Sequence, residues 1–430
     1  MRRLFPLLLS LGYFASCQTE EAKVAPVQVV TEDIPRYWTA FDSIQITTDS
    51  LERLAILNRN FIQPATAGQR AMFSARRYRP EEYVDAMLRY PRFYTSIREN
   101  TLRAGEFGDE LQTGVERLRE IYPSLRPAQV YFTMGVFLSP GTTTDSMILI
   151  GSEFALTDTT TVTQEFTGRL TLMKDYVANQ PIDDLVFLNV HEYVHTQQAD
   201  ALTANLLSQT LREGVAEFVA ELAMDARSKA PAEAYFAQNR DAVIAEFTKA
   251  MYSTSYRNWL WNSDENPFGV RDLSYSLGRD MAQHFYDASD DKSEAVRQLV
   301  ELDYGNDDAI ASFVAGLDYF PEPLSVYSAA RPVVERIERG EVQPDSLARL
   351  DIHFAQPMNP AFRGFDYGPL GEDAVLGVEE VVGWSDHGQT FTVRVRRVPG
   401  TMQQVTLTER FEDAEGRALK PYLVEWKAEE

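Results

Sequence analysis

The chain has 430 residues, of which 44% are hydrophobic, 11% aromatic and 24% charged. This length predicts two or three domains with sizeable cores, and the aromatic content excludes disorder as the dominant state. The 41 Lys and Arg residues and 64 Asp and Glu residues give a net charge of −23, so nucleic acid is not expected as a partner. A single cysteine excludes a disulfide scaffold and a cysteine-based zinc finger.

Residues 1–16 have the pattern of a secretory signal peptide. Two arginines precede an apolar run over residues 4–14, which is too short to span a bilayer. The run ends in Phe-Ala-Ser-Cys at Cys17, which resembles a bacterial lipoprotein processing site, although Phe14 stands where an aliphatic residue is usual. The alternative is an ordinary secretory signal followed by a chance cysteine.

The lipoprotein resemblance implies a location for the mature protein. Cleavage before Cys17 would leave this residue lipidated, anchored in a membrane and followed by a flexible tether over 17–32. Gln18 stands where the inner-membrane retention signal of many lipoproteins has Asp. We therefore expect a cell-envelope lipoprotein of the outer membrane, facing the periplasm or the surface.

Hydrophobic periodicity divides the rest of the chain. Residues 33–127 have the apolar spacing of helices, as in segment 110–122. Two β-like runs follow, at 129–138 and 146–156, which predict a hairpin or two neighbouring strands. Residues 181–340 are again mostly helical in pattern.

The pattern changes to period two near residue 345. Phe391, Val393 and Val395 alternate with polar residues, which predicts an antiparallel β-sandwich. Segment 352–359 resembles the opening strand of bacterial Ig-like domains. We expect an Ig-like domain over 346–430 that acts as a spacer or docks an envelope protein.

Residues 182–198 predict a helix that carries the sequence His191-Glu192-Tyr193-Val194-His195. Two histidines four residues apart share one helical face, so both imidazoles can reach a single cation. Glu192 lies about a third of a turn away, where it can accept a proton from water without becoming a metal ligand. The structural alternative is a helix whose histidines face a polar core.

A third ligand is available 18 residues after His195, at Glu213. Gly214 is unfavourable inside a helix and predicts close approach to the helix of the two histidines. Glu213 and Glu217 share a face, so one is expected to bind the metal while the other holds a histidine. The alternative is a solvated acidic stripe formed by Glu213, Glu217 and Glu221.

The two segments HEYVH and EGVAEF together resemble the gluzincins, zinc peptidases with two histidines and one glutamate on the metal. The Glu-Gly pair is similar to that of their aminopeptidase branch. The chain also resembles bacterial lipoproteins related to the gliding-motility lipoprotein GldB, which overlap a predicted zinc-protease family. This second resemblance rests on segment 33–38 and on the same HEYVH and EGVAEF motifs. A third stretch, 275–278 running into 287–299, supports it.

The gluzincin resemblance implies Zn²⁺ held by His191, His195 and Glu213, with Glu192 as the general base. It also implies an α+β, zincin-like and mostly helical domain over 33–345. A small antiparallel sheet would precede the metal helix, with 146–156 as the edge strand that holds extended substrate. Some members of the GldB-related lipoprotein families lack intact metal ligands. The presence of all the ligands in this chain favours an active enzyme.

The resemblance further implies a donor to the oxyanion of the tetrahedral intermediate. In aminopeptidase-type gluzincins this is a tyrosine some sixty residues after the glutamate ligand, and Tyr275 lies 62 residues after Glu213. Gly278 would let the helix of Tyr275 approach the site. Arg279 and His284 are the alternative donors.

Two function classes remain open. One is a lipid-anchored zinc metallopeptidase that acts on a peptide or protein. The other is a gliding-motility-related envelope lipoprotein with a structural or assembly role and no proteolysis; a binding protein that docks a partner through its Ig-like domain is a third reading. The sequence fits an endopeptidase and an aminopeptidase equally well, and it does not identify the substrate.

The lipidation site generates the first prediction. We expect Cys17→Ser to move the protein from the membrane fraction to the soluble fraction, or to stall processing, because the acyl chains would supply the membrane affinity. Fractionation followed by immunoblotting measures this. Membrane association of fully processed Cys17→Ser would mean that another protein anchors the chain.

Overall fold

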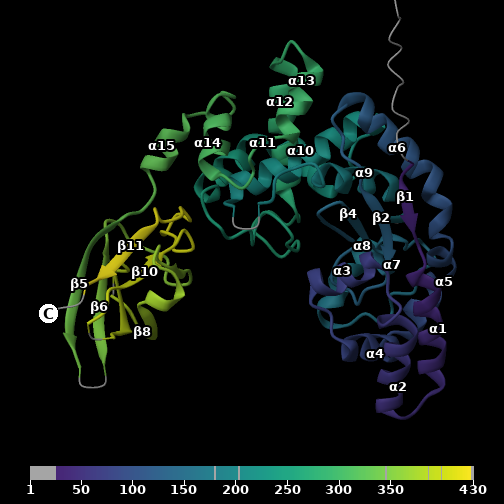
Figure 1. Cartoon of the computed structure of the whole chain (residues 1–430). Helices are drawn as coiled ribbons and strands as arrows, with labels where there is room; N and C mark the ends of the chain where they lie inside the picture. The colour runs from purple at the N-terminus through teal and green to yellow at the C-terminus, as the bar shows by residue number, and fades with distance from the viewer. Residues whose placement is uncertain are drawn as a thin grey trace, which may run out of the picture.

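The computed structural model describes residues 26–178, 181–201, 204–343, 346–385, 387–398 and 400–427. The expected signal peptide, Cys17 and residues 18–25 of the expected tether lie outside the described residues. The fold is α+β: helices and a small sheet form most of the chain, and strands form the C-terminal part (Figure 1). None of the helices described combines the length and the apolar character needed to cross a membrane.

The first part is helical, as predicted. Its helices are α1 (Asp33–Ile46), α2 (Ser50–Leu57), α3 (Ala67–Arg76), α4 (Pro80–Arg89), α5 (Pro91–Leu102) and α6 (Gly108–Ile121). The predicted apolar face of segment 110–122 is confirmed, since Leu111, Val115, Leu118 and Tyr122 are all buried in the main core.

A four-stranded sheet follows, and it corrects two expectations. Its strands are β1 (Gln28–Val30), β2 (Gln129–Thr133), β3 (Gly141–Thr144) and β4 (Met147–Gly151), in the order β1-β2-β4-β3. The sheet is mixed and not antiparallel, because β2 runs parallel to both β1 and β4. The two β-like runs do form neighbouring strands, β2 and β4. The prediction that 146–156 is the edge strand is wrong, because β4 is interior and residues 152–155 form helix α7 (Ser152–Ala155).

The edge position belongs to β3, which pairs antiparallel with β4. The two strands are joined by a two-residue turn in which Asp145 has φ 47°. Such left-handed residues suit tight hairpins, and the three threonines of β3 are β-branched residues that favour extended backbone. This hairpin therefore covers the side of β4 that was expected to be free.

The second helical part packs beside this sheet (Figure 1). Its helices are α8 (Met173–Ala178), α9 (Leu185–His195), α10 (Leu206–Met224), α11 (Pro231–Ala250), α12 (Leu273–Ala288), α13 (Lys292–Val300), α14 (Asp307–Ala315) and α15 (Leu324–Ala329). The predicted helix 182–198 is confirmed over α9, which is preceded by a 3₁₀ turn at Pro181–Asp184.

Gly214 of α10 marks a backbone contact with α12 and not, as expected, with the histidine helix. A Cβ on Gly214 would lie 2.0 Å from the carbonyl carbon of Gly278, and a Cβ on Gly278 would lie 1.9 Å from the carbonyl oxygen of Thr210. The two helices can cross at this distance only because both positions are glycine. Because Tyr275 lies one turn before Gly278, this crossing sets its position.

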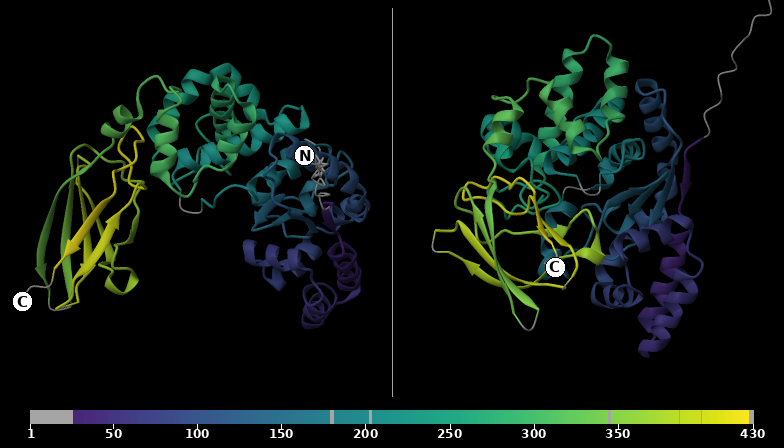
Figure 2. Two further views of the ribbon diagram at one scale, coloured as in Figure 1. Left: turned by 45° about the horizontal axis from the view of Figure 1, so that its top comes forward. Right: turned by 60° about the vertical axis from the view of Figure 1, so that its left-hand side comes forward.

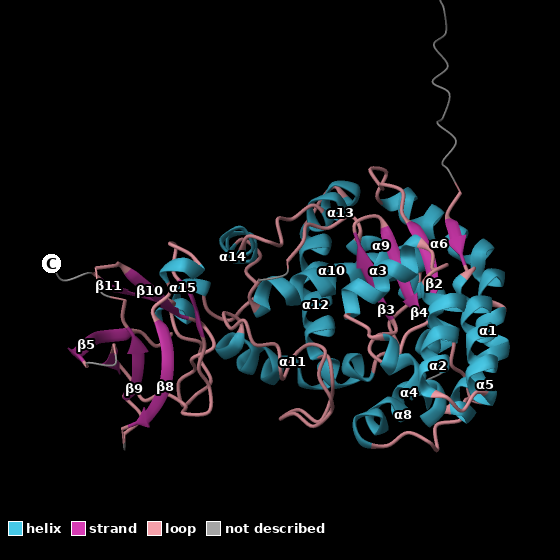
Figure 3. Ribbon diagram, turned by 60° about the horizontal axis from the view of Figure 1, so that its bottom comes forward, coloured by secondary structure: helices cyan, strands magenta, loops and turns pink. Residues whose placement is uncertain are grey.

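The C-terminal part is a β-rich unit at one end of the molecule (Figures 2 and 3). Its strands are β5 (Val334–Val342), β6 (Leu347–Phe354), β7 (Phe365–Tyr367), β8 (Gly377–Trp384), β9 (Thr390–Arg396), β10 (Gln403–Leu407) and β11 (Tyr422–Trp426). They form two antiparallel sheets, β5-β6-β9-β8 and β11-β10-β7, whose inner residues share one core. The expected boundary at 345/346 falls between β5 and β6, which pair, so this unit begins near Val334.

The helix crossing generates the second prediction. We expect Gly278→Ala to lower the thermal unfolding temperature, because forcing a methyl group against the Thr210 carbonyl costs about 1–3 kcal/mol or more. Gly108→Ala, where a Cβ would meet no atom within 4 Å, is the matched control and should change stability little. Equal unfolding temperatures for the two variants in differential scanning calorimetry would contradict the close contact.

Candidate metal centre

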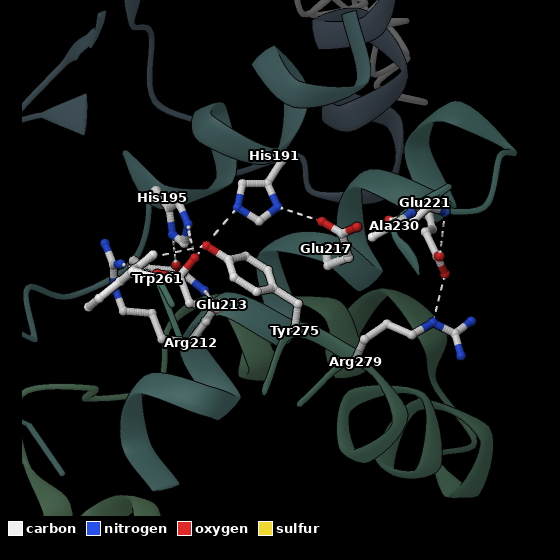
Figure 4. Close-up of polar contacts among 12 residues, drawn as sticks. His191, His195, Arg212, Glu213, Glu217, Glu221, Ala230, Trp261, Tyr275 and Arg279 are labelled. Carbon is white, nitrogen blue, oxygen red and sulfur yellow. Dashed lines mark hydrogen bonds and ion pairs between the residues drawn. The ribbon is translucent and has the colours of Figure 1, made fainter. Parts of the chain in front are cut away.

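His191, His195 and Glu213 converge on one point between α9 and α10 (Figure 4). The distance from Glu213 Oε2 is 3.1 Å to His195 Nε2 and 3.7 Å to His191 Nε2. One ligand atom from each residue lies within 4.8 Å of the other two, and all three side chains are buried. The structure thus brings together the three residues that the sequence singled out.

The donor set fits Zn²⁺. Zinc in proteins takes imidazole nitrogens and carboxylate oxygens at about 2.0–2.1 Å, so tetrahedral ligand atoms lie about 3.4 Å apart. The two distances from Glu213 Oε2 fall on either side of that value. A tetrahedral ion held by these three residues would keep one coordination position for a further ligand, as catalytic zinc sites do.

Each of the three residues has a second polar partner that fixes its orientation. His191 Nδ1 lies 2.9 Å from Glu217 Oε2, and His195 Nδ1 lies 2.6 Å from Gln198 Oε1. Arg212 donates to the other carboxylate oxygen of Glu213, Oε1, at 3.2 Å. These contacts direct both Nε2 atoms and one carboxylate oxygen toward the same point, as metal ligands require.

Sequence reasoning anticipated Glu217 in this role but missed Gln198 and Arg212. Their only sequence signal is proximity to the ligand candidates: Gln198 follows His195 by three residues, and Arg212 directly precedes Glu213. Gln198 also donates to the carbonyl oxygen of Arg212 at 3.0 Å, which joins the end of α9 to α10.

The carboxylates and histidines of the cluster stabilise each other's charges. Burial by itself would lower the pKa of His191, but its contacts with Glu213 and Glu217 outweigh this effect and raise the pKa to about 10. Burial likewise opposes ionisation of Glu213, yet His195, His191 and Arg212 hold the pKa of its carboxyl well below the ordinary value. Positive charge at this point is therefore stabilised by the surrounding carboxylates.

The solvated-stripe alternative is wrong, because Glu213, Glu217 and Glu221 are only 4%, 8% and 6% exposed. Glu221 forms a separate group: its Oε2 accepts from Arg279 at 2.8 Å and from Arg227 at 2.9 Å. Arg279 therefore points to Glu221 and away from the three-residue cluster (Figure 4).

Glu192 lies beside the edge strand. It is half-buried on α9, and a Cβ built on Gly141 of β3 would lie 3.3 Å from its Oε1. The absence of a side chain at residue 141 leaves the space that this carboxylate occupies.

Tyr275 lies next to the cluster. Its ring is inclined by 34° to the His191 ring, with 5.9 Å between centroids, and its hydroxyl is directed toward the two histidines and Glu213 (Figure 4). Burial and the charge of Glu213 raise the pKa of Tyr275 well above its ordinary value, so the phenol keeps its proton near neutral pH. His284, one alternative donor, instead donates to the carbonyl oxygen of Leu317 at 2.9 Å.

No protein-family model matches the chain, and no curated protein matches it. Among solved structures, that of surface layer protein SbsC, domains 1–6, aligns with 93% of this chain and 45% of that protein, at 13% identity and a TM-score of 0.18. The chain thus spans less than half of that structure. A TM-score this low carries no inference about fold or function.

The ligand geometry generates the third prediction. We expect His191→Ala and Glu213→Ala to lower bound zinc from about one per chain to well below it, because each removes one of three protein ligands. Glu217→Gln keeps an oxygen that can accept from His191 but loses the negative charge, and should weaken zinc binding by about tenfold or more. Plasma mass spectrometry after dialysis against zinc measures the content.

His284→Ala, a change of a histidine outside the cluster, is the control and should retain zinc. Full zinc retention in Glu213→Ala would move the ligand to Glu217 or refute the assigned triad.

Proposed function

We propose that the chain is a zincin-like zinc metallopeptidase of the gluzincin type. The observation that carries the proposal is the convergence of His191, His195 and Glu213, each oriented by a further polar partner. The HExxH spacing and the glutamate 18 residues later support the same conclusion from the sequence.

Zinc bound by this triad supplies a Lewis acid that polarises a carbonyl and lowers the pKa of water. Glu192 accepts the proton of the attacking water and passes it to the leaving amine as the carbon–nitrogen bond breaks. Tyr275 donates a hydrogen bond to the carbonyl oxygen as its negative charge develops. Its position beside His191 and its retained proton suit this role.

The sheet topology makes β3 the candidate strand for binding substrate. β3 is an edge strand, and its Gly141 lies against the Glu192 carboxylate. An extended peptide that adds to β3 would therefore pass close to the proton acceptor. This role belongs to β3 and not to segment 146–156.

The remaining assignments are part of the same proposal. The β-rich unit is an Ig-like sandwich that spaces or docks the enzyme, with an envelope protein as its partner. A lipid on Cys17 holds the protein in the bacterial outer membrane, and the chain is related to the GldB-like lipoproteins. Two antiparallel sheets around one core support the sandwich.

The fourth prediction tests the enzyme. The soluble chain lacking residues 1–17 should cleave members of a peptide library and lose this activity with a chelator. Glu192→Gln should keep zinc and lower turnover by about 10²–10⁴-fold, because it removes the general base. Mass spectrometry of the peptides gives the cleavage sites.

Glu116→Gln, an exposed glutamate on α6, is the matched control and should cleave at the rate of the unchanged chain. No cleavage by the zinc-loaded chain, or unchanged turnover in Glu192→Gln, would favour an envelope lipoprotein with a structural or assembly role.

A further inference from the structure

Trp261 is an exposed tryptophan in the middle of the segment between α11 and α12. Its side chain is 57% exposed, although the two preceding residues, Trp259 and Leu260, are buried. Exposing an indole to water forgoes most of the stabilisation that burial would supply. The position of this ring therefore contributes little to the core.

The backbone at Trp261 is strained, with φ 52°. Bulky residues rarely adopt this left-handed conformation, and it persists only where neighbouring contacts enforce it. Here Asn262 donates its backbone N–H to Asp272 Oδ1 at 3.4 Å, and Asp272 donates its own to Asn262 Oδ1 at 2.8 Å. These two bonds close the loop directly after Trp261 and hold the left-handed turn.

The turn directs the indole to the metal centre. Trp261 Nε1–H donates to the Tyr275 hydroxyl oxygen at 3.2 Å, and the Tyr256 ring packs edge-on against the indole with 5.5 Å between centroids. Tyr256 is fixed in turn by donating its hydroxyl to the carbonyl oxygen of Ala204. Because Tyr275 accepts from Trp261, its own proton stays available for another acceptor.

Exposure increases from the metal ligands to Trp261. The ligands are buried, Tyr275 is half-buried and Trp261 is mostly exposed. The indole lies beside Tyr275, the group proposed to contact the scissile carbonyl (Figure 4), and it is the more exposed of the two. A substrate residue next to that carbonyl would meet the free face of the indole.

We propose that Trp261 determines substrate preference and positions Tyr275, an inference that rests on the proposed peptidase function. Its exposed ring contacts a large apolar side chain next to the scissile bond, so peptides with Leu or Phe there are favoured over those with Asp. Its indole N–H holds the Tyr275 hydroxyl in the direction needed for donation to the carbonyl oxygen.

Two substitutions separate these contributions. Trp261→Phe keeps an aromatic ring but removes the N–H, so it should lower kcat by about tenfold or more with little change in KM. Trp261→Ala removes both, so it should also raise KM for the Leu and Phe peptides by about tenfold and abolish the preference over Asp. Tyr367→Ala, an exposed aromatic residue of β7, is the control and should leave both constants unchanged.

A binding measurement makes the test independent of turnover. In the Glu192→Gln background, isothermal titration with the best library peptide and with its Asp-substituted form gives the two affinities without cleavage. We expect the Leu or Phe form to bind about tenfold more tightly, and Trp261→Ala to remove this difference. Zinc content and unfolding temperature should stay unchanged in both tryptophan variants.

The outcomes distinguish this inference from the proposed function. Failure of the zinc-loaded chain to cleave or bind any peptide overturns both. Cleavage with unchanged kcat in Trp261→Phe, or with unchanged peptide preference in Trp261→Ala, overturns the inference alone and leaves the peptidase intact. Introducing Trp261→Phe into Tyr275→Phe should lower kcat no further, and an additive loss would exclude action through Tyr275.

Discussion

The burial of glutamates on α10 is the constraint on which the rest of the structure depends. Glu213, Glu217 and Glu221 recur at four-residue spacing, and all three lie inside the helical core. An unpaired charge in such surroundings costs several kcal/mol, so every carboxylate requires a cationic or hydrogen-bonding partner. The two histidines of α9 meet this requirement for the first two, and arginines meet it for Glu221.

Helix α10 also makes a close backbone contact with α12. Because Gly214 and Gly278 allow backbone contact, α12 lies closer to α10 than side chains would permit. The site is therefore assembled from three helices by two different effects. Charge pairing joins α9 to α10. The two glycines let α12 pack directly on α10, which places Tyr275 over His191.

Local patterns predicted the parts of this arrangement that depend on local geometry. The four-residue spacing of His191 and His195 determines a shared helical face in any helix, and the face that carries Glu213 follows in the same way. The order of strands in a sheet is not determined by local residue spacing. The hairpin of β3 and β4 and the parallel pairing of β2 and β4 depend on tertiary packing, so the pattern of residues 146–156 does not reveal which strand lies at the edge.

The tertiary contacts around the site were beyond sequence reasoning for the same reason. Gly214 correctly indicated a close helix contact, but a glycine does not specify its partner. The only signal for Gln198 is its position three residues after His195, at the end of α9. Trp261 carries no sequence signal, and its role follows from a left-handed turn. The conformation of Trp261 contradicts its local preference and needs support from neighbouring contacts, which is typical of residues at functional sites.

The segment between α11 and α12 connects the candidate metal centre to the β-rich unit. Arg257 forms two hydrogen bonds to the buried carboxylate of Glu412, at 2.9 and 2.7 Å, and covers the ring of Phe362. Four residues later the same segment presents Trp261 to Tyr275. A buried carboxylate paired in this way resists displacement, since separation would leave its charge without a partner. The β-rich unit is therefore part of the framework that fixes the segment bearing Trp261, and is not merely an appended domain.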